Sequence, residues 1–321
     1  MKLQTKVPIA VSTYPADYSS KLLLIGSCFA EHIGSKLDYY KLRTVQNPLG
    51  ILFHARAIEK FILRAIKEEY FEEEDLFYLN ERWHSFDAHS DLSMPEKEAT
   101  LELLNESLKD ARLSLSEATH FFITLGTAWG YRYKKTGDWV ANCHKVPQAE
   151  FSKALFEVKE ITESLKAIIE AVRSINPGLH FTFTVSPVRH LKDGFVENQQ
   201  SKAYLIAAVQ EVLALHKSDD SISYFPAYEI MMDELRDYRF YANDLVHPNE
   251  LAVDYIWERF RITWISDEAS NTMEKVEEIQ KGINHKPFSP KSEQHKKFMD
   301  TLQKKITYLQ KEYPFMDFKQ R

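Results

Sequence analysis

The chain has 321 residues, of which 44% are hydrophobic and 27% are charged, and its formal net charge is −6. This composition excludes an intrinsically disordered chain, and the lack of a dense Lys/Arg stripe before the C-terminal tail argues against a nucleic-acid partner. The length suits either two average domains or one large α/β domain with additions. The N-terminus lacks the apolar region of a signal peptide and no later run is long enough to span a bilayer, so we expect a cytoplasmic protein without a membrane partner.

The most informative segment is an apolar run that stops at a glycine. Residues 22–25 read Leu-Leu-Leu-Ile, and Gly26, Ser27 and Cys28 follow. Apolar side chains then recur at helical spacing, at Phe29, Ile33, Leu37 and Tyr40. The pattern predicts a buried strand, a tight turn and a helix whose first residues include a hydroxyl and a thiol. A capping serine and a core cysteine would give the same pattern, so other segments must decide whether either residue is a nucleophile.

The rest of the chain alternates predicted strands with predicted helices. A turn at 46–50 precedes a helix over 57–66, and residues 71–94 read as an insertion with short strands. The later elements are a polar helix over 95–113, a strand at 120–125, a hairpin over 131–147, a helix from about 150 to 175, a strand at 180–185, a helix over 198–216, a strand at 222–225 and a helix opened by Pro248. This alternation predicts a parallel sheet in a domain over residues 1–265.

From about residue 266 the sequence becomes rich in Glu, Lys and Gln. A Pro-containing segment at 286–290 divides it into two helical pieces, and we interpret residues 266–321 as a helical extension. A narrow apolar stripe in the second piece favours docking on the domain over pairing with another subunit. The stripe consists of Met299, Leu302, Ile306 and Leu309.

A second candidate for chemistry lies just before the last helix of the domain. Asp244 stands three residues before His247, so one short loop brings a carboxylate and an imidazole together. In a nucleophilic hydrolase the imidazole removes the proton of the nucleophile, and the carboxylate orients the imidazole. Neither motif is specific alone, but a nucleophile after the first strand together with Asp-x-x-His before the last helix is a specific order.

These residues resemble a known family. Residues 26–30 spell the motif that names the GSCFA family, whose members look like SGNH-type hydrolases, and further blocks that resemble the family lie at 47–50, 124–129, 141–145, 186–190 and 235–241. The resemblance covers roughly residues 20–260. It implies a three-layer, flavodoxin-like parallel sheet with helices on both faces, and a site at the carboxyl ends of the strands built from Ser or Cys, His and Asp. We expect no cofactor and no metal.

The first block departs from the usual SGNH pattern of Gly-Asp-Ser. An ungapped match puts Ser27 under the Asp and Cys28 under the Ser, so the identity of the nucleophile stays open. We favour Cys28, because a helix N-terminus and His247 would activate it as a thiolate, whereas Ser27 would need a general base at the moment of attack.

The chain also lacks the Asn that SGNH enzymes carry near the third strand, so other groups must bind the oxyanion. We expect Asn142 and the backbone N–H groups of Cys28 and Gly50 to serve, with His144 as a further candidate. A carboxylate or phosphate of the substrate would be held by the arginines of two loops, although each could instead form a structural salt bridge. These arginines are Arg189, Arg236 and Arg239.

The function that we expect is hydrolysis of an acyl ester of a small molecule or glycan, such as O-deacetylation of a carbohydrate, through an acyl-enzyme. The ester and carbohydrate details come from the resemblance alone. Alternatives are an acyltransferase that uses the same site and a catalytically silent binding module. A zinc site is a third alternative, with the ligands Cys143, His144, Asp244 and His247.

Overall fold

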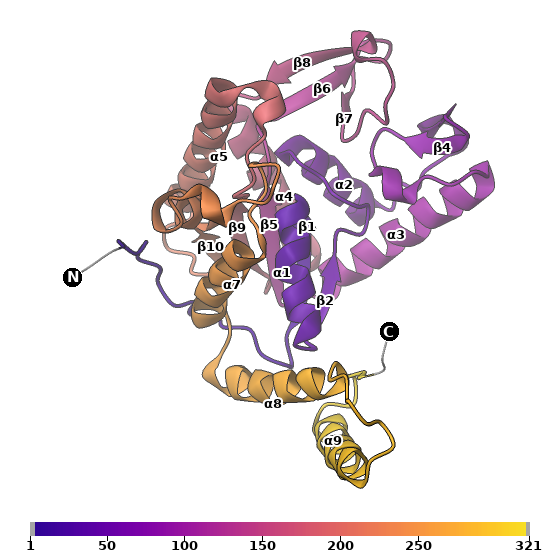
Figure 1. The fold of residues 1–321 in the computed structure, drawn as a ribbon. Helices are drawn as coiled ribbons and strands as arrows, with labels where there is room; N and C mark the ends of the chain where they lie inside the picture. Colours follow the sequence, from indigo (N-terminus) through magenta and orange to yellow (C-terminus); the bar gives the residue numbers. More distant parts are fainter. Residues whose placement is uncertain (1–3, 319–321) are drawn as a thin grey trace.

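The computed structural model describes residues 4–318, and its centre is a five-stranded parallel sheet in the order β10-β9-β5-β1-β2 (Figure 1). The strands are β1 (Lys21–Gly26), β2 (Arg43–Gln46), β5 (His120–Leu125), β9 (His180–Val185) and β10 (Ile222–Phe225). Counted within this sheet along the chain, the order is 2-1-3-4-5, which is the flavodoxin-like arrangement. The predicted fold class is therefore confirmed.

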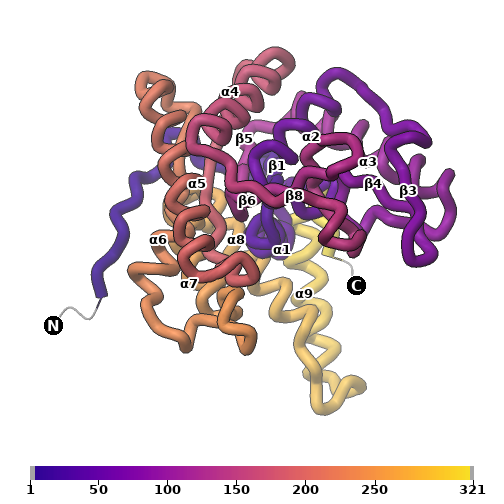
Figure 2. Tube along the Cα trace, turned by 90° about the horizontal axis from the view of Figure 1, so that it is seen from above, coloured from indigo at the N-terminus to yellow at the C-terminus, as the bar shows by residue number. Residues whose placement is uncertain are grey.

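Alternate side chains of β1 enter two different cores. Leu23 and Ile25 pack with helices on one face, whereas Leu22 and Leu24 pack on the other. A strand buried on both faces reads as a continuous apolar run, which is why residues 22–25 carry no polar side chain. The sheet is thus the middle layer of three (Figure 2).

Within residues 4–318, helices cover both faces of the sheet. The first face holds α2 (Ala55–Lys67), α3 (Lys97–Glu117), α4 (Val158–Ile175) and α5 (Phe195–Leu215). The second face holds α1 (Cys28–Tyr39) and α7 (Glu250–Trp264). Between β10 and α7 the chain forms α6 (Ala227–Glu229) and a π-helical turn at Ile230–Glu234.

Two small antiparallel units lie outside the sheet, at the end of the molecule opposite the C-terminal helices (Figure 1). One is the hairpin β3 (Leu76–Leu79) and β4 (Arg82–Ser85), inside the expected insertion. The other pairs β6 (Trp129–Tyr133) with β7 (Trp139–Val140) and with β8 (Phe151–Leu155). The prediction that a helix begins near residue 150 was wrong, because residues 151–155 complete this second sheet and α4 begins only at Val158.

The C-terminal extension forms α8 (Asp267–Ile283) and α9 (Glu293–Glu312). Its apolar residues share one core with α1 and α7, through Met273, Val276 and Ile279 of α8 and Leu302 and Leu309 of α9. The stripe of α9 therefore packs within this chain, although Met299 is 43% exposed. Among residues 4–318 no helix is both long and apolar enough to cross a bilayer.

Candidate functional site

The junction between β1 and α1 is held by backbone contacts on both sides of Gly26. Its N–H donates to Asn47 Oδ1 over 2.8 Å, and its carbonyl oxygen accepts from the N–H of Leu52 over 3.0 Å. Gly26 has a φ of +142°, and a Cβ atom there would lie 2.1 Å from the carbonyl oxygen of Thr124. Only glycine fits, because its backbone packs directly on β5. The following two residues are therefore fixed at the carboxyl end of the sheet.

Ser27 is the N-cap of α1. Its Oγ accepts from the N–H of Phe29 over 3.4 Å, and the residue has no exposed surface. The hydroxyl thus takes the capping role, which the sequence pattern left open.

Cys28 is the first residue of α1 and is partly exposed. Burial raises the pKa of its thiol, and the charge of Glu31 raises it further. The Lys202 ammonium and the backbone N–H groups of Cys28 and Phe29 act in the opposite direction. The expected activation of this thiol needs correction: the helix amides do lower the pKa, but burial outweighs them and the nearby cation is Lys202 rather than His247.

The predicted Asp–His pair is formed. His247 Nδ1 lies 2.6 Å from Asp244 Oδ2, and Asp244 Oδ1 accepts from the backbone N–H groups of Val246 and His247. These three interactions lower the pKa of Asp244 to about 2. An ionised carboxylate on Nδ1–H leaves Nε2 as the proton-accepting nitrogen of the imidazole.

The loop that carries this pair is fastened to the end of β9. Arg189 donates from its backbone N–H to the carbonyl of Val246 and from Nη1 to the carbonyl of Leu245, each over 3.1 Å. The charge of His247 lowers the pKa of two other histidines, His32 on α1 and His190 after β9. His247 therefore lies close to both. Within residues 4–318 no hydrogen bond joins His247 to the side chain of Ser27 or Cys28.

Lys202 is a site residue that the sequence did not reveal. This side chain of α5 is fully buried, and its Nζ donates to the carbonyls of Gly126 and Ser186 over 2.8 and 2.7 Å. These carbonyls follow β5 and β9, so the ammonium lies at the carboxyl edge of the sheet. Burial lowers its pKa to about 7, while Cys28 raises it. A sequence signal existed, because Asn198, Ser201 and Lys202 precede Leu205 at i, i+3, i+4 and i+7 and so continue the buried face of α5.

His190, which follows β9, is affected by the charges of both Lys202 and His247. Burial, together with the charges of Lys202 and His247, lowers its pKa to about 3. Its Nε2 is buried without a hydrogen-bond partner among the described residues. His190 is therefore a neutral imidazole with one ring nitrogen available to a bound molecule.

The expected oxyanion donors do not gather at this point. The N–H of Gly50 donates to the carbonyl of Asn47 over 2.7 Å, closing the turn that follows β2. Asn142 Oδ1 accepts from the N–H of His144. His144 is buried, and its ring nitrogens contact Ser90 Oγ and the carbonyl of Ser85, so it ties the insertion to β7. Of the donors that we expected, the backbone N–H of Cys28 faces the thiol.

The other predicted arginines have protein partners. Arg239 is 71% exposed in its side chain and pairs with Asp237 at 3.0 Å, and Arg236 lies 3.9 Å from Asp233. The zinc alternative fails in the described part of the chain, where no group of three or more His, Cys, Asp or Glu side chains is placed to hold a metal.

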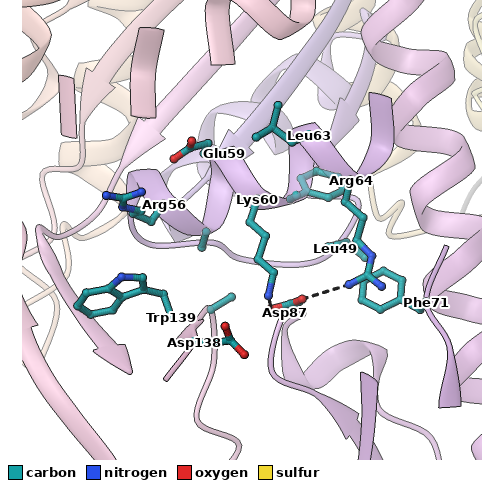
Figure 3. A pocket seen from close by; sticks show the side chains of 13 residues that line it. Leu49, Arg56, Glu59, Lys60, Leu63, Arg64, Phe71, Asp87, Asp138 and Trp139 are labelled. Atoms are coloured by element: carbon teal, nitrogen blue, oxygen red, sulfur yellow. Dashed lines mark hydrogen bonds and ion pairs between the residues drawn. The ribbon is translucent and has the colours of Figure 1, made fainter. Parts of the chain in front are cut away.

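A cavity of about 280 Å³ lies beside α2 and the insertion, away from these residues (Figure 3). Lys60 and Arg64 point toward Asp87, with N–O distances of 2.6 and 3.2 Å. Glu59 accepts from Ser164 Oγ over 2.6 Å. Because these charges satisfy one another, we assign this cavity no part in the chemistry.

Comparison with family models covers most of the chain. The model of the GSCFA family matches residues 21–260, and that of the GSCFA domain protein, C-terminal domain, matches residues 276–321. The chain belongs to the GSCFA family. A search of curated proteins found no significant match.

Two solved structures are distantly similar to this GSCFA protein. One is a crystal structure that is 12% identical to this chain and has a TM-score of 0.39. The match covers 76% of this chain and 96% of the other. An acetyl xylan esterase, Est2A, from the rumen bacterium Butyrivibrio proteoclasticus is 9% identical and has a TM-score of 0.38. This second match covers 80% of the present chain and 65% of the esterase, just under two thirds of its length. Similarity at this level does not bear on function.

Proposed function

We propose that this GSCFA protein is an esterase that transfers an acyl group from an ester to the thiol of Cys28 and then to water. The observation that supports the proposal best is the Asp244–His247 pair, whose Nε2 is left as a base at the carboxyl edge of the sheet. That edge is where open α/β sheets bind ligands.

The reaction would proceed in two steps. The thiol proton passes to His247 Nε2, the thiolate forms a C–S bond with the ester carbonyl, and the C–O bond breaks as the alcohol leaves with that proton. Water then attacks the thioester with the same imidazole as base, releasing the carboxylic acid and the thiol. The Lys202 ammonium favours the thiolate in the first step, and the backbone N–H of Cys28 is the candidate donor to the oxyanion.

We favour Cys28 over Ser27 because of access. Ser27 has no exposed surface and its Oγ caps α1, whereas Cys28 is partly exposed. The distance between His247 Nε2 and Cys28 Sγ would have to shorten when substrate binds. Catalytic hydrogen bonds in enzymes are often long without substrate and shorten only in the complex.

The test is turnover of p-nitrophenyl acetate by the wild type and by Cys28→Ala, His247→Ala and Ser27→Ala. We expect the first two variants to lose at least about 10²-fold in kcat/KM and Ser27→Ala to keep most activity. Mass spectrometry of the quenched wild type should find an acetyl group on Cys28. Absence of turnover by the wild type, or equal turnover by His247→Ala, would contradict the proposal.

Two observations favour a second candidate, a binding module without turnover. Burial raises the pKa of the Cys28 thiol, and the N–H of Gly50 is already engaged. Such a module would bind ligand at the same edge without reacting. Iodoacetamide separates the two candidates, because alkylation of Cys28 at pH 7 that is rapid and depends on His247 argues against the silent module.

A further inference from the structure

A second cavity, of about 310 Å³, adjoins the candidate site. One wall comes from the segment between β9 and the start of α5, and the other comes from α6, the π-helical turn and the loop after it. Its volume is at the lower limit of ordinary ligand pockets. The volume and position suit one substituent of a substrate whose ester lies at Cys28.

Three residues of the cavity also support the chemistry. Arg189 holds the loop of Asp244 and His247 through the carbonyls of Leu245 and Val246. Asn198 Oδ1 accepts from the backbone N–H of His190 over 2.8 Å. The ring of Tyr228 lies 5.6 Å from Lys202 Nζ. Residues that line the cavity therefore contact the loop of Asp244 and His247, the backbone of His190 and the side chain of Lys202.

Much of the lining is apolar or aromatic. Met231, which is fully buried, and Met232 come from the π-helical turn, and Phe195, Tyr238 and Tyr241 surround the Arg189 guanidinium at 5.4 to 5.9 Å. Flat π faces and thioether groups of this kind suit a ring.

The polar groups of the cavity leave donors in excess over acceptors. Both oxygens of Asp237 are engaged by Arg239, and Gln199 Oε1 accepts from the hydroxyl of Tyr228. Asn198 Oδ1 is engaged by His190, as described. By contrast, the Arg189 guanidinium has five N–H groups, and one of its nitrogens donates to the carbonyl of Leu245. The Arg236 guanidinium lies 3.9 Å from the carboxylate of Asp233, which is too far for a hydrogen bond. A neutral sugar needs acceptors for its hydroxyls, whereas a carboxylate uses the free donors.

We propose that this cavity binds a ring that carries a carboxylate, and that the esters processed by this protein contain such a group. The inference rests on the proposed function for the position of the ester. Two sources share this chemistry, an aromatic acid and a uronic acid, and binding measurements distinguish them.

The test measures binding by ligand-observed NMR, with no turnover required. Benzoate is compared with benzamide, and glucuronate with glucose, on the wild type, Arg236→Gln and the control Arg82→Gln, which replaces an exposed arginine of β4. We expect at least one carboxylate to bind and its neutral partner to bind at least about tenfold more weakly. Arg236→Gln should weaken the carboxylate about fivefold or more, and Arg82→Gln should not change it.

Each outcome has a separate meaning. Binding of benzoate without glucuronate identifies an aromatic acid, and the reverse identifies a uronic acid. If neither carboxylate binds, if each neutral partner binds as well as its acid, or if Arg236→Gln matches the wild type, the inference is wrong. Carboxylate binding by a protein that does not hydrolyse p-nitrophenyl acetate would leave this site standing and remove only the esterase proposal.

Discussion

Replacing Lys202 by methionine separates its electrostatic role from its packing. The side chain is buried, and its Nζ contacts two carbonyls, so the change removes a charge while keeping most of the volume. Depression of the lysine pKa from 10.5 to about 7 corresponds to about 5 kcal/mol of unfavourable burial of the cation, which the variant no longer carries. Against that gain, two carbonyls lose their donor at about 1–3 kcal/mol each. The two effects largely offset each other, so the free energy of unfolding should change by no more than about 3 kcal/mol.

The thiol should respond more strongly than the fold. As a general scale, two unit charges about 8 Å apart at an effective dielectric constant near 20 interact by about 2 kcal/mol, which corresponds to about 1.5 pKa units. Because the ammonium lowers the pKa of Cys28, its loss raises that pKa and reduces the thiolate fraction at a given pH. We expect alkylation of Cys28 by iodoacetamide at pH 7 to slow by about tenfold or more in Lys202→Met.

The assay follows the rate between pH 6 and 10 by peptide mass spectrometry. Cys143 in the same molecule provides an internal reference, since burial raises its pKa to about 11. Lys192→Met, at an exposed position, is the matched control. An unchanged pH profile for Cys28 in a folded Lys202→Met protein would refute the electrostatic role and leave Lys202 as a purely structural tie between β5, β9 and α5.

Three further changes test the fold. Burial lowers the pKa of His54 to about 4, so between pH 6.5 and 4 the unfolded chain binds a proton at His54 that the folded chain does not bind. His54 alone should therefore lower the free energy of unfolding by about 3 kcal/mol over this range as the pH falls. His54→Asn should flatten this pH dependence in urea titrations. Gly26→Ala should lower the free energy of unfolding by at least about 2 kcal/mol, and an unchanged urea midpoint would contradict the close approach to Thr124. Leu302→Ala should lower it by about 2–4 kcal/mol and expose α9 to protease, and equal protease resistance would contradict its docking.

The sequence predicted four of the five strands of the sheet, β1, β5, β9 and β10, and their parallel pairing. It missed β2 because no side chain of this edge strand is buried: Arg43 is exposed and Val45 is 39% exposed, so the segment lacks an apolar run. It missed β8 for a similar reason, since residues 152–154 are exposed and the strand pairs only with β6.

The site was harder to predict where its chemistry depends on burial. The Asp244–His247 pair follows from a local spacing, and the structure has it at 2.6 Å. Lys202 belongs to a helix and is nearly 175 positions from Cys28, and a lysine on a helix is usually solvated. Its role depends on two carbonyls that reach it only after β5, β9 and α5 have packed together. No spacing within the sequence predicts that Lys202 contacts the carbonyls of Gly126 and Ser186.

The five residues of the Gly-Ser-Cys-Phe-Ala motif have separate physical roles. Gly26 permits the backbone of β1 to pack against Thr124, and Ser27 caps α1 from a fully buried position. Phe29 and Ala30, each 1% exposed, anchor the first turn of α1 in the core. Each of these roles needs burial, and a nucleophile needs access to substrate. Cys28 is the one position of the five that keeps exposed surface while its own backbone N–H faces its side chain, so the chemistry that we propose falls on the thiol.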